Sequence, residues 1–299
     1  MVDSFGNNDE RREMTQSERT DPGVEVAPVS VVVPCYRCTD TIAAAVGSVA
    51  AQTLRPAEVV LVDDCSGDRT LAALHEVAAA YAEGWIKVIA LPANGGPSRA
   101  RNAGWQLASQ DYIAFLDADD TWFPAKLELQ VEALRADPEI ALIAHRMVVR
   151  ERGLPPPAVR VPVRTSIVGR RRLLLNNPFP TASVVLRRDL PFRFDERYRR
   201  VEDFLLWAQI AFSGYRCARI NQTLAAWHKA NYGAGGLSED VAAMHRAGRE
   251  VRLELLRQRL VSRPEHYFAR AIGMLRKARR NVWMATRRRR DDVKPQRAT

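Results

Sequence analysis

The chain has 299 residues, of which 46% are hydrophobic and 27% charged, and its formal net charge is +10. These proportions are ordinary for a soluble globular protein, so we expect a sizeable core in one large domain or in one domain with appendages. No stretch approaches the roughly 20 uncharged apolar residues that a membrane-spanning helix needs, and the polar N-terminus lacks the apolar core of a secretory signal.

Short apolar runs alternate with helical patterns over the first 122 residues. We predict strands at 29–33, 58–62, 85–90 and 112–116, and helices at 39–52, 68–82 and 98–108. Asp40 is the expected N-cap of the first helix. Strands that alternate with helices imply a parallel sheet.

The second half of the sequence is less regular. It predicts a helix at 123–136 and a strand at 140–149, then a loop broken by three prolines, Pro155 to Pro157. A strand at 181–186, a helix at 201–213 and helices at 239–261 and 264–284 follow. Residues 270–290 contain nine cations and no acid: Arg270, Arg276, Lys277, Arg279, Arg280 and Arg287 to Arg290.

The chain contains four cysteines, Cys35, Cys38, Cys65 and Cys217. The first two have C-x-x-C spacing, but a zinc site would need a second pair or histidines at matching spacing. We therefore expect reduced thiols in a cytosolic protein, with a redox role for the C-x-x-C pair as the alternative.

Polar residues follow three of the predicted strands where each strand ends. They are Pro34-Cys35-Tyr36, Asp63-Asp64 and Asp117-Ala118-Asp119. In open parallel sheets, ligands bind outside the carboxyl ends of the strands. These three segments should therefore converge on one crevice.

Three carboxylates, Asp117, Asp119 and Asp120, lie within four residues, and like charges this close raise each other's pKa values. The cluster therefore needs a positive partner, unless it is a solvated loop in which Asp120 caps a helix that starts near Trp122. A calcium loop is excluded because the twelve-residue spacing with its terminal glutamate is missing. The remaining interpretation is a site for one divalent cation that also binds a nucleotide diphosphate, as Mg²⁺ often does.

Several common nucleotide and hydrolase motifs are absent. No G-x-G-x-x-G follows the first strand, and neither a P-loop nor a G-x-S-x-G elbow occurs. Five other motifs do occur in order: VSVVVPCYR, VVLVDDCSGDRT, LPANGGPSRARNAG, DYIAFLDADDTW and RRVEDFLLW. In order, spacing and length, the region from residue 29 to about 238 resembles the family 2 glycosyltransferases.

That resemblance implies an α/β chain with the GT-A fold. We expect a single Rossmann-like nucleotide-binding domain with a mostly parallel central sheet, plus a C-terminal helical extension. The expected division is a disordered tail at 1–27, the GT-A domain at 28–238, a basic helical segment at 239–286 and a disordered tail at 287–299.

The resemblance also implies an inverting transfer of a sugar from a nucleotide-diphosphate sugar to a hydroxyl acceptor. Pro34 and Tyr36 lie where family members contact the base, and Asp64 lies where a carboxylate accepts from base or ribose. Asn94 and Gly95 begin a Gly-rich segment whose backbone can approach the donor closely. The nucleotide stays open between UDP, GDP and dTDP.

The resemblance implies that three further charged residues lie close to the donor phosphates. Asp117 and Asp119 match the family's D-x-D, so the expected positive partner is Mg²⁺ or Mn²⁺, acting as a Lewis acid on the leaving diphosphate. Asp119 is the better ligand, whereas Asp117 also suits the ribose or a metal-bound water. Arg101 has two interpretations: it pairs with the diphosphate, or it orders the acidic site through an ion pair with the aspartates.

The remaining implied residues lie in the second half of the chain. Asp203, in the pair Glu202-Asp203, is the expected general base on the acceptor hydroxyl, and the alternative is helix N-terminal charge. His228 is implied as a third metal ligand or a phosphate contact and Lys229 as a phosphate contact, with an exposed loop pair as the alternative. The segment 178–183 is where family members shape the acceptor site.

The basic residues 270–290 interleave with aromatic and aliphatic ones. This pattern favours either an anionic membrane surface or a helix packed on the domain followed by a disordered arginine tail. No recognition motif indicates specific nucleic-acid binding. We expect a cytoplasmic protein, at the inner membrane face if the basic segment binds lipid, with a glycan or a lipid-linked glycan as acceptor.

Two other functions stay open on the sequence. A non-catalytic protein of the same fold would bind membrane or nucleic acid through its basic C-terminus. A nucleotidyltransferase would need a Gly-rich loop soon after the first strand, and PCYRCTDT has no glycine.

Overall fold

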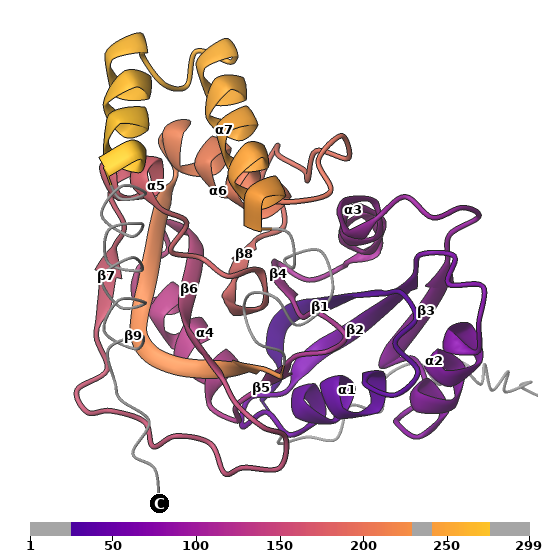
Figure 1. The fold of residues 1–299 in the computed structure, drawn as a ribbon. Coiled ribbons are helices and arrows are strands. Elements are labelled where there is room, and N and C mark those ends of the chain that lie inside the picture. Colours follow the sequence, from indigo (N-terminus) through magenta and orange to yellow (C-terminus); the bar gives the residue numbers. More distant parts are fainter. Residues whose placement is uncertain (1–24, 229–240, 276–299) are drawn as a thin grey trace, which may run out of the picture.

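The computed structural model describes residues 25–228 and 241–275. These residues build a mixed α/β structure around a nine-stranded sheet (Figure 1). Four neighbouring strands are parallel, which confirms the predicted α/β class with a mostly parallel central sheet. In spatial order they are β3 (Ile86–Ala90), β2 (Pro56–Asp63), β1 (Ala27–Cys35) and β4 (Tyr112–Phe115).

Beyond β4 the sheet continues with strands of mixed direction. β8 (Val185–Arg187) runs antiparallel to β4 and to β6 (Ile140–Val149). β9 (Arg216–Trp227) is parallel to β6, and its far end pairs with the short β5 (Thr121–Trp122). β7 (Thr165–Ile167) pairs with β9 outside this path.

Helices cover both faces of the sheet, so its central strands are buried on both sides. In β1, Val31 and Val33 pack into the core under α1 (Ile42–Ala50), α2 (Thr70–Ala79) and α4 (Lys126–Ala136). Val32 packs into the opposite core with α3 (Pro97–Leu107) and α6 (Glu202–Phe212), because side chains alternate along a strand. Burial on both faces explains why three consecutive residues of this strand, Val31 to Val33, are all valine.

Three local predictions are wrong. Asp40 is not the N-cap of α1: Thr41 holds that position, and its hydroxyl donates to the Cys38 carbonyl. Asp120 does not cap a helix at Trp122, because β5 intervenes and α4 begins only at Lys126. The predicted strand at 181–186 is a 3₁₀ turn, Thr181–Ser183, followed by β8, because the N–H and hydroxyl of Ser183 both donate locally to the Pro180 carbonyl instead of to a neighbouring strand.

The described C-terminal residues are helical, as the pattern predicts, whereas residues 276–284 of the second predicted helix lie outside the described residues. α7 (Val241–Arg257) is followed by helical residues 263–275, and a short α5 (Arg170–Leu175) lies beside them (Figure 1). The second helix starts at a capping box in which the Ser262 hydroxyl and backbone N–H both donate to Glu265. No helix in the described ranges is long and apolar enough to cross a membrane.

All four cysteines are free thiols, and three of them are buried. Burial raises the pKa of the Cys217 thiol to about 12 and also raises that of Cys35. A raised pKa keeps the Cys35 and Cys217 thiols protonated and therefore unreactive, whereas a hydrogen bond with Cys35 lowers the pKa of Cys38.

Candidate functional site

The three predicted strand ends do meet at one edge of the sheet. The N–H of Asp64, just after β2, donates to the carbonyl of Cys35 at the end of β1 (2.9 Å), and the N–H of Leu116 donates to Val32 (3.1 Å). At this edge Tyr36 is 48% exposed, as expected for a residue that contacts a ligand, and Pro34 is half-buried. The edge is therefore the candidate site, and the D-x-D follows β4 at the same end.

Asp64 connects the end of β2 to the Gly-rich segment. Its two carboxylate oxygens accept the backbone N–H groups of Gly95 (2.9 Å) and Gly96 (2.7 Å), and its carbonyl accepts the Asn94 amide (2.9 Å). Gly96 has a φ of +83°, a conformation that residues with a Cβ rarely adopt. Asp64 thus shapes the loop, while each of its oxygens keeps a lone pair for a further donor.

Arg101 on α3 is the positive partner of the acidic cluster in this structure. One terminal nitrogen lies 2.7 Å from Asp117 Oδ1 and the other lies 2.8 Å from Glu202 Oε1. The Arg101 side chain is only 6% exposed, and the two carboxylates hold the pKa of its guanidinium above the usual value. Of its two interpretations, the ion pair with the acidic site is the one present. The sequence analysis expected the aspartates of the acidic cluster as partners of Arg101, but it did not name Glu202.

The expected base, Asp203, lies in the first turn of α6. Its Oδ1 accepts the N–H of Phe204, while Oδ2 accepts from the Asn177 amide (3.0 Å) and the Thr181 hydroxyl (3.3 Å). Burial, and then the charge of neighbouring Glu202, raise the pKa of Asp203 to about 7. A carboxyl group that titrates near neutral pH is suited to accept a proton.

The backbone is strained just before this base. Val201 has a φ of +54° and a ψ of +21°, a left-handed conformation that β-branched residues avoid. Arg37 and Cys65, in the turns after β1 and β2, also have positive φ. Such strain often accumulates at functional sites, at a cost of about 1–3 kcal/mol per residue.

The predicted acceptor segment, residues 178–183, is held by three side-chain donors. The Trp207 indole donates to Phe179 (3.0 Å), the Trp122 indole to Ala182 (2.8 Å), and the Gln130 amide to Ser183 (2.9 Å), each to a carbonyl oxygen. Thr181 is thereby fixed against Asp203. Sequence reasoning missed Asn177, whose only signal was its position one residue before this segment.

His228, at the end of β9, lies close to the D-x-D. Its Nδ1 is 2.9 Å from the Arg150 carbonyl oxygen, which can only accept, so in the neutral ring Nδ1 carries the hydrogen. Nε2 then accepts the Thr121 hydroxyl at 2.8 Å, and Thr121 comes two residues after Asp119. Lys229, the other expected phosphate contact, lies outside the described residues.

Within residues 25–228 and 241–275, no three Asp, Glu, His or Cys side chains form a ready-made metal cluster. The local chemistry nevertheless suits a hard divalent cation. Asp117 uses only Oδ1 for Arg101 and is 33% exposed. The hydrogen bond from His228 Nδ1 to a backbone carbonyl is one that metal-binding histidines make, but the lone pair of Nε2 accepts the Thr121 hydroxyl in this structure. A metal at this position stays a prediction.

Comparison with known proteins places this site in a family context. The model of glycosyl transferase family 2 matches residues 30–194. The succinoglycan biosynthesis protein ExoO of Rhizobium meliloti is 34% identical over 213 residues, which are 66% of this chain and 60% of ExoO. WfgD of Escherichia coli, a UDP-Glc:α-D-GlcNAc-diphosphoundecaprenol β-1,3-glucosyltransferase, is 30% identical over 61% of this chain and 69% of its own length.

Solved structures show the same fold. TarS residues 1–349 of S. aureus in complex with UDP-GlcNAc superpose with a TM-score of 0.60 at 24% identity, over 76% of this chain and 66% of that chain. The chain thus spans about two thirds of this structure and 60% of the length of ExoO.

Proposed function

This chain belongs to glycosyl transferase family 2 and has the GT-A fold, and from that membership we propose that it transfers a sugar from a nucleotide-diphosphate sugar to a hydroxyl acceptor with inversion at the anomeric carbon. The observation that carries the proposal is the double ion pair of Arg101. A single guanidinium joins Asp117 of the D-x-D to Glu202, the neighbour of Asp203. The proposed leaving-group side and the proposed base therefore lie on either side of one side chain.

The donor would bind at the carboxyl edge of β1 and β2. Exposed Tyr36, with Pro34, offers a surface for the base, and Asn94 and Gly95 are held beside it by hydrogen bonds to Asp64. The similarity to WfgD, whose name specifies UDP-Glc, makes UDP the first nucleotide to test ahead of GDP and dTDP.

A divalent cation, Mg²⁺ or Mn²⁺, would be held by Asp119 and the second oxygen of Asp117. Nε2 of His228 would be a further ligand once the Thr121 hydroxyl turns away from it. When bound, such a cation supplies Lewis-acid stabilisation of the diphosphate as the bond to the sugar breaks. The chain's own contribution is to orient these oxygens. Arg101 does so for Asp117, and the Arg150 carbonyl does so for His228.

Asp203 would take the proton from the acceptor hydroxyl. The acceptor oxygen then forms a bond to the anomeric carbon as the bond from that carbon to the diphosphate oxygen breaks, and the nucleoside diphosphate leaves with the bonding electron pair. Attack from the face opposite the leaving group inverts the centre. Asn177 and Thr181 hold the Asp203 carboxylate for this step, because both donate to Oδ2.

We propose that the acceptor is a glycan or a lipid-linked glycan. ExoO is named for succinoglycan biosynthesis, AmsB of Erwinia amylovora for amylovoran biosynthesis, and WfgD for an acceptor linked to diphosphoundecaprenol. These names support a role in polysaccharide assembly for this chain.

Calorimetric titration of the purified protein with UDP, GDP and dTDP, each with and without Mn²⁺, tests the donor site. One nucleotide should bind with metal, and Asp119→Ala should abolish that binding. The matched control is Asp111→Ala, at the opposite end of β4, which should bind as the parent does. If no nucleotide binds under either condition, the proposal fails.

A further inference from the structure

The helix at residues 263–275 has an apolar face that points to solvent. Tyr267, Phe268, Met274 and Leu275 are 62%, 58%, 58% and 65% exposed, and Ala271 between them is also exposed. At about 100° per residue these positions share one side of the helix, within an arc of about 120°. Surface apolar residues are ordinarily scattered, so a contiguous stripe of this kind marks an interaction surface.

The stripe faces outward because the opposite side of the same helix is packed. His266 and Ala269 are 7% and 4% exposed, and Ala269 lies in the core shared with α6. Glu265 pairs with Arg170 of α5 (3.4 Å), and Arg170 also donates to the Leu260 carbonyl (2.7 Å). The helix is therefore fixed in orientation, and its apolar stripe has no partner among the described residues.

Positive charge borders this stripe. Arg263 and Arg270 are both exposed and lie along one edge of it on the helical projection. In the sequence that follows, residues 276–290 contain eight more cations and no acid. An apolar face with a cationic border is the pattern of helices that lie in the interface of an anionic membrane.

We propose that the outward face of residues 263–275 docks on an anionic lipid surface, with Tyr267, Phe268, Met274 and Leu275 inserted below the head groups. Association with a second copy of the chain would bring the same arginines together, and their repulsion disfavours that occupant. Docking of this face on lipid does not depend on sugar transfer by the chain.

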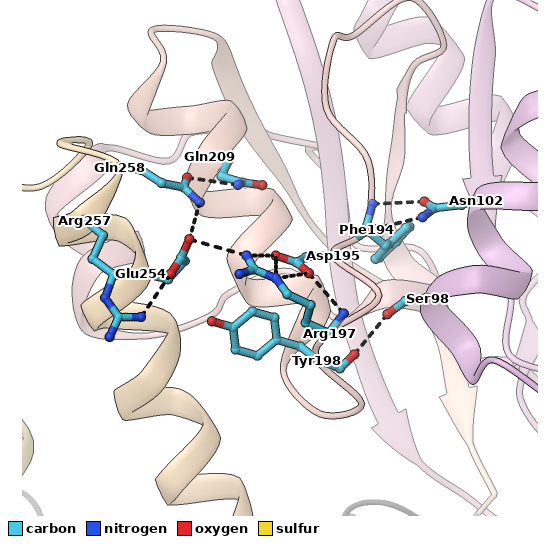
Figure 2. Close-up of polar contacts among 10 residues, drawn as sticks. All are labelled: Ser98, Asn102, Phe194, Asp195, Arg197, Tyr198, Gln209, Glu254, Arg257 and Gln258. Carbon is cyan, nitrogen blue, oxygen red and sulfur yellow. Dashed lines mark hydrogen bonds and ion pairs between the residues drawn. The ribbon is translucent and has the colours of Figure 1, made fainter.

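Docking would also orient the candidate active site, because α7, which precedes the helix at 263–275, is joined to that site by side-chain contacts. Glu254 of α7 accepts from Arg197 (3.4 Å), and Arg197 pairs with Asp195 (2.6 Å) in the loop that leads to Glu202 (Figure 2). The other side of this loop is tied to α3, where Ser98 donates to the Tyr198 carbonyl (3.1 Å). The C-terminal helices are thus connected through this loop to α6, which carries the proposed base Asp203.

Vesicle co-sedimentation of the full chain tests the proposal. The parent should bind vesicles that contain phosphatidylglycerol and should bind pure phosphatidylcholine vesicles far less. Tyr267→Ser with Phe268→Ser should lower the partition coefficient about tenfold or more, because two large apolar side chains no longer leave water. The matched control is Leu154→Ser with Ile167→Ser, two exposed residues elsewhere (51% each), which should leave binding unchanged.

Two charge-reversal variants test whether binding depends on this helix or on positive charge in general. Arg270→Glu should weaken binding to anionic vesicles, whereas Arg164→Glu, at another exposed position, should not. The circular dichroism spectrum and the thermal midpoint of each variant should match the parent, since all these side chains are exposed. Nucleotide binding should be unchanged in every variant, which separates this test from that of the donor site.

Three results would overturn the proposal. The first is no vesicle binding by the parent. The second is parent-like binding by the Tyr267/Phe268 double variant, which would leave only the basic tail as the lipid contact. The third is a dimer, seen by sedimentation equilibrium, that the same double variant dissociates, since the face would then be a contact between copies.

Discussion

At the scale of single residues, charge is arranged around Arg101. Its guanidinium is buried, and burying a charge is costly unless partners compensate. Asp117 and Glu202 provide that compensation, and Phe194 lies under the guanidinium at 5.3 Å from its ring centroid. Removing Arg101, Asp117 or Glu202 leaves the other two with unbalanced charge.

Arg101→Met should lower the free energy of unfolding at pH 7 by about 3 kcal/mol or more, because two poorly solvated carboxylates lose their partner. Adding Glu202→Gln should recover part of the loss. Urea unfolding of both variants measures this. Arg99→Met, on the same helix but half-exposed, should change stability by about 0.5 kcal/mol or less. Equal losses at both positions would contradict the buried-pair account.

The ionisation of Asp203 should determine how kcat/KM falls at acidic pH, the acidic limb of the pH–rate profile. A base acts when ionised, and its pKa is raised to about 7, so kcat/KM should fall roughly tenfold per pH unit below pH 7. Asp203→Asn should reduce kcat by about 10²-fold or more and remove this limb. A profile that stays flat down to pH 5 in the parent would exclude Asp203 as the titrating base.

The same pKa has a consequence for stability. Since folding raises the pKa of Asp203, the folded state disfavours its ionised form, and the free energy of unfolding should decline as pH rises from about 4 to 7. Asp203→Asn should lack this part of the decline. Urea unfolding of parent and variant across that range measures the difference.

Thr181 should act as a positioning residue through Asp203. Its hydroxyl stabilises the ionised carboxylate, so Thr181→Val should move the acidic limb of kcat/KM to higher pH and lower kcat, while the KM for donor stays the same. Thr165→Val, on exposed β7, is the matched control. A fall in rate without movement of the limb would indicate a structural role only.

At the scale of elements, α3 lies unusually close to the sheet. A Cβ at Gly104 would stand 2.4 Å from Val32 Cγ1 and 3.2 Å from Val62 Cγ2, so only glycine allows the helix to approach β1 and β2 this closely. Arg101 is one turn earlier on the same helix. The reach of Arg101 to Asp117 and Glu202 therefore depends on this close approach.

Gly104→Ala should destabilise the protein by about 1–3 kcal/mol, because buried valines must shift, and it should also lower nucleotide binding. Gly47→Ala is the matched control: it too is a helical glycine, but its Cβ would meet nothing within 4 Å. That variant should be neutral or more stable by up to about 1 kcal/mol. Thermal and urea unfolding of both measure the contrast.

At the scale of the whole molecule, the C-terminal helices share a core with the sheet. Val251 and Leu255 of α7 are completely buried in the cluster that contains Phe204 and Trp207 of α6. Arg252 lies over the Phe204 ring at 5.7 Å. The C-terminal helices therefore help to support α6, the helix that carries Asp203.

Leu255→Ala should lower the free energy of unfolding by about 2–5 kcal/mol, because it leaves a cavity in that shared core. Leu253→Ala, on the same helix but 43% exposed, should cost about 1 kcal/mol or less. Circular dichroism during urea unfolding should show one transition for both. A separate early transition for Leu255→Ala would mean that the C-terminal helices unfold on their own.

Local patterns were sufficient to predict the elements that have a continuous apolar run or a regular helical period. The run at 140–149 predicts β6 with its observed bounds, and the alternation of strands and helices predicts the parallel sheet and the edge at which its strand ends meet. The order of five motifs predicts the family, which the matched family model confirms. Periodicity and strand-end chemistry are properties of neighbouring residues, so the sequence alone displays them.

Only the tertiary structure decided which groups meet across long separations. The partners of Arg101 are 16 and 101 residues away, and those of His228 are 107 and 78 residues away. The same applies to Asp120, which is not a helix cap because β9 returns to pair with β5 beside it. Side-chain hydrogen bonds and ion pairs form wherever packing brings donors and acceptors together, and no local pattern encodes that placement.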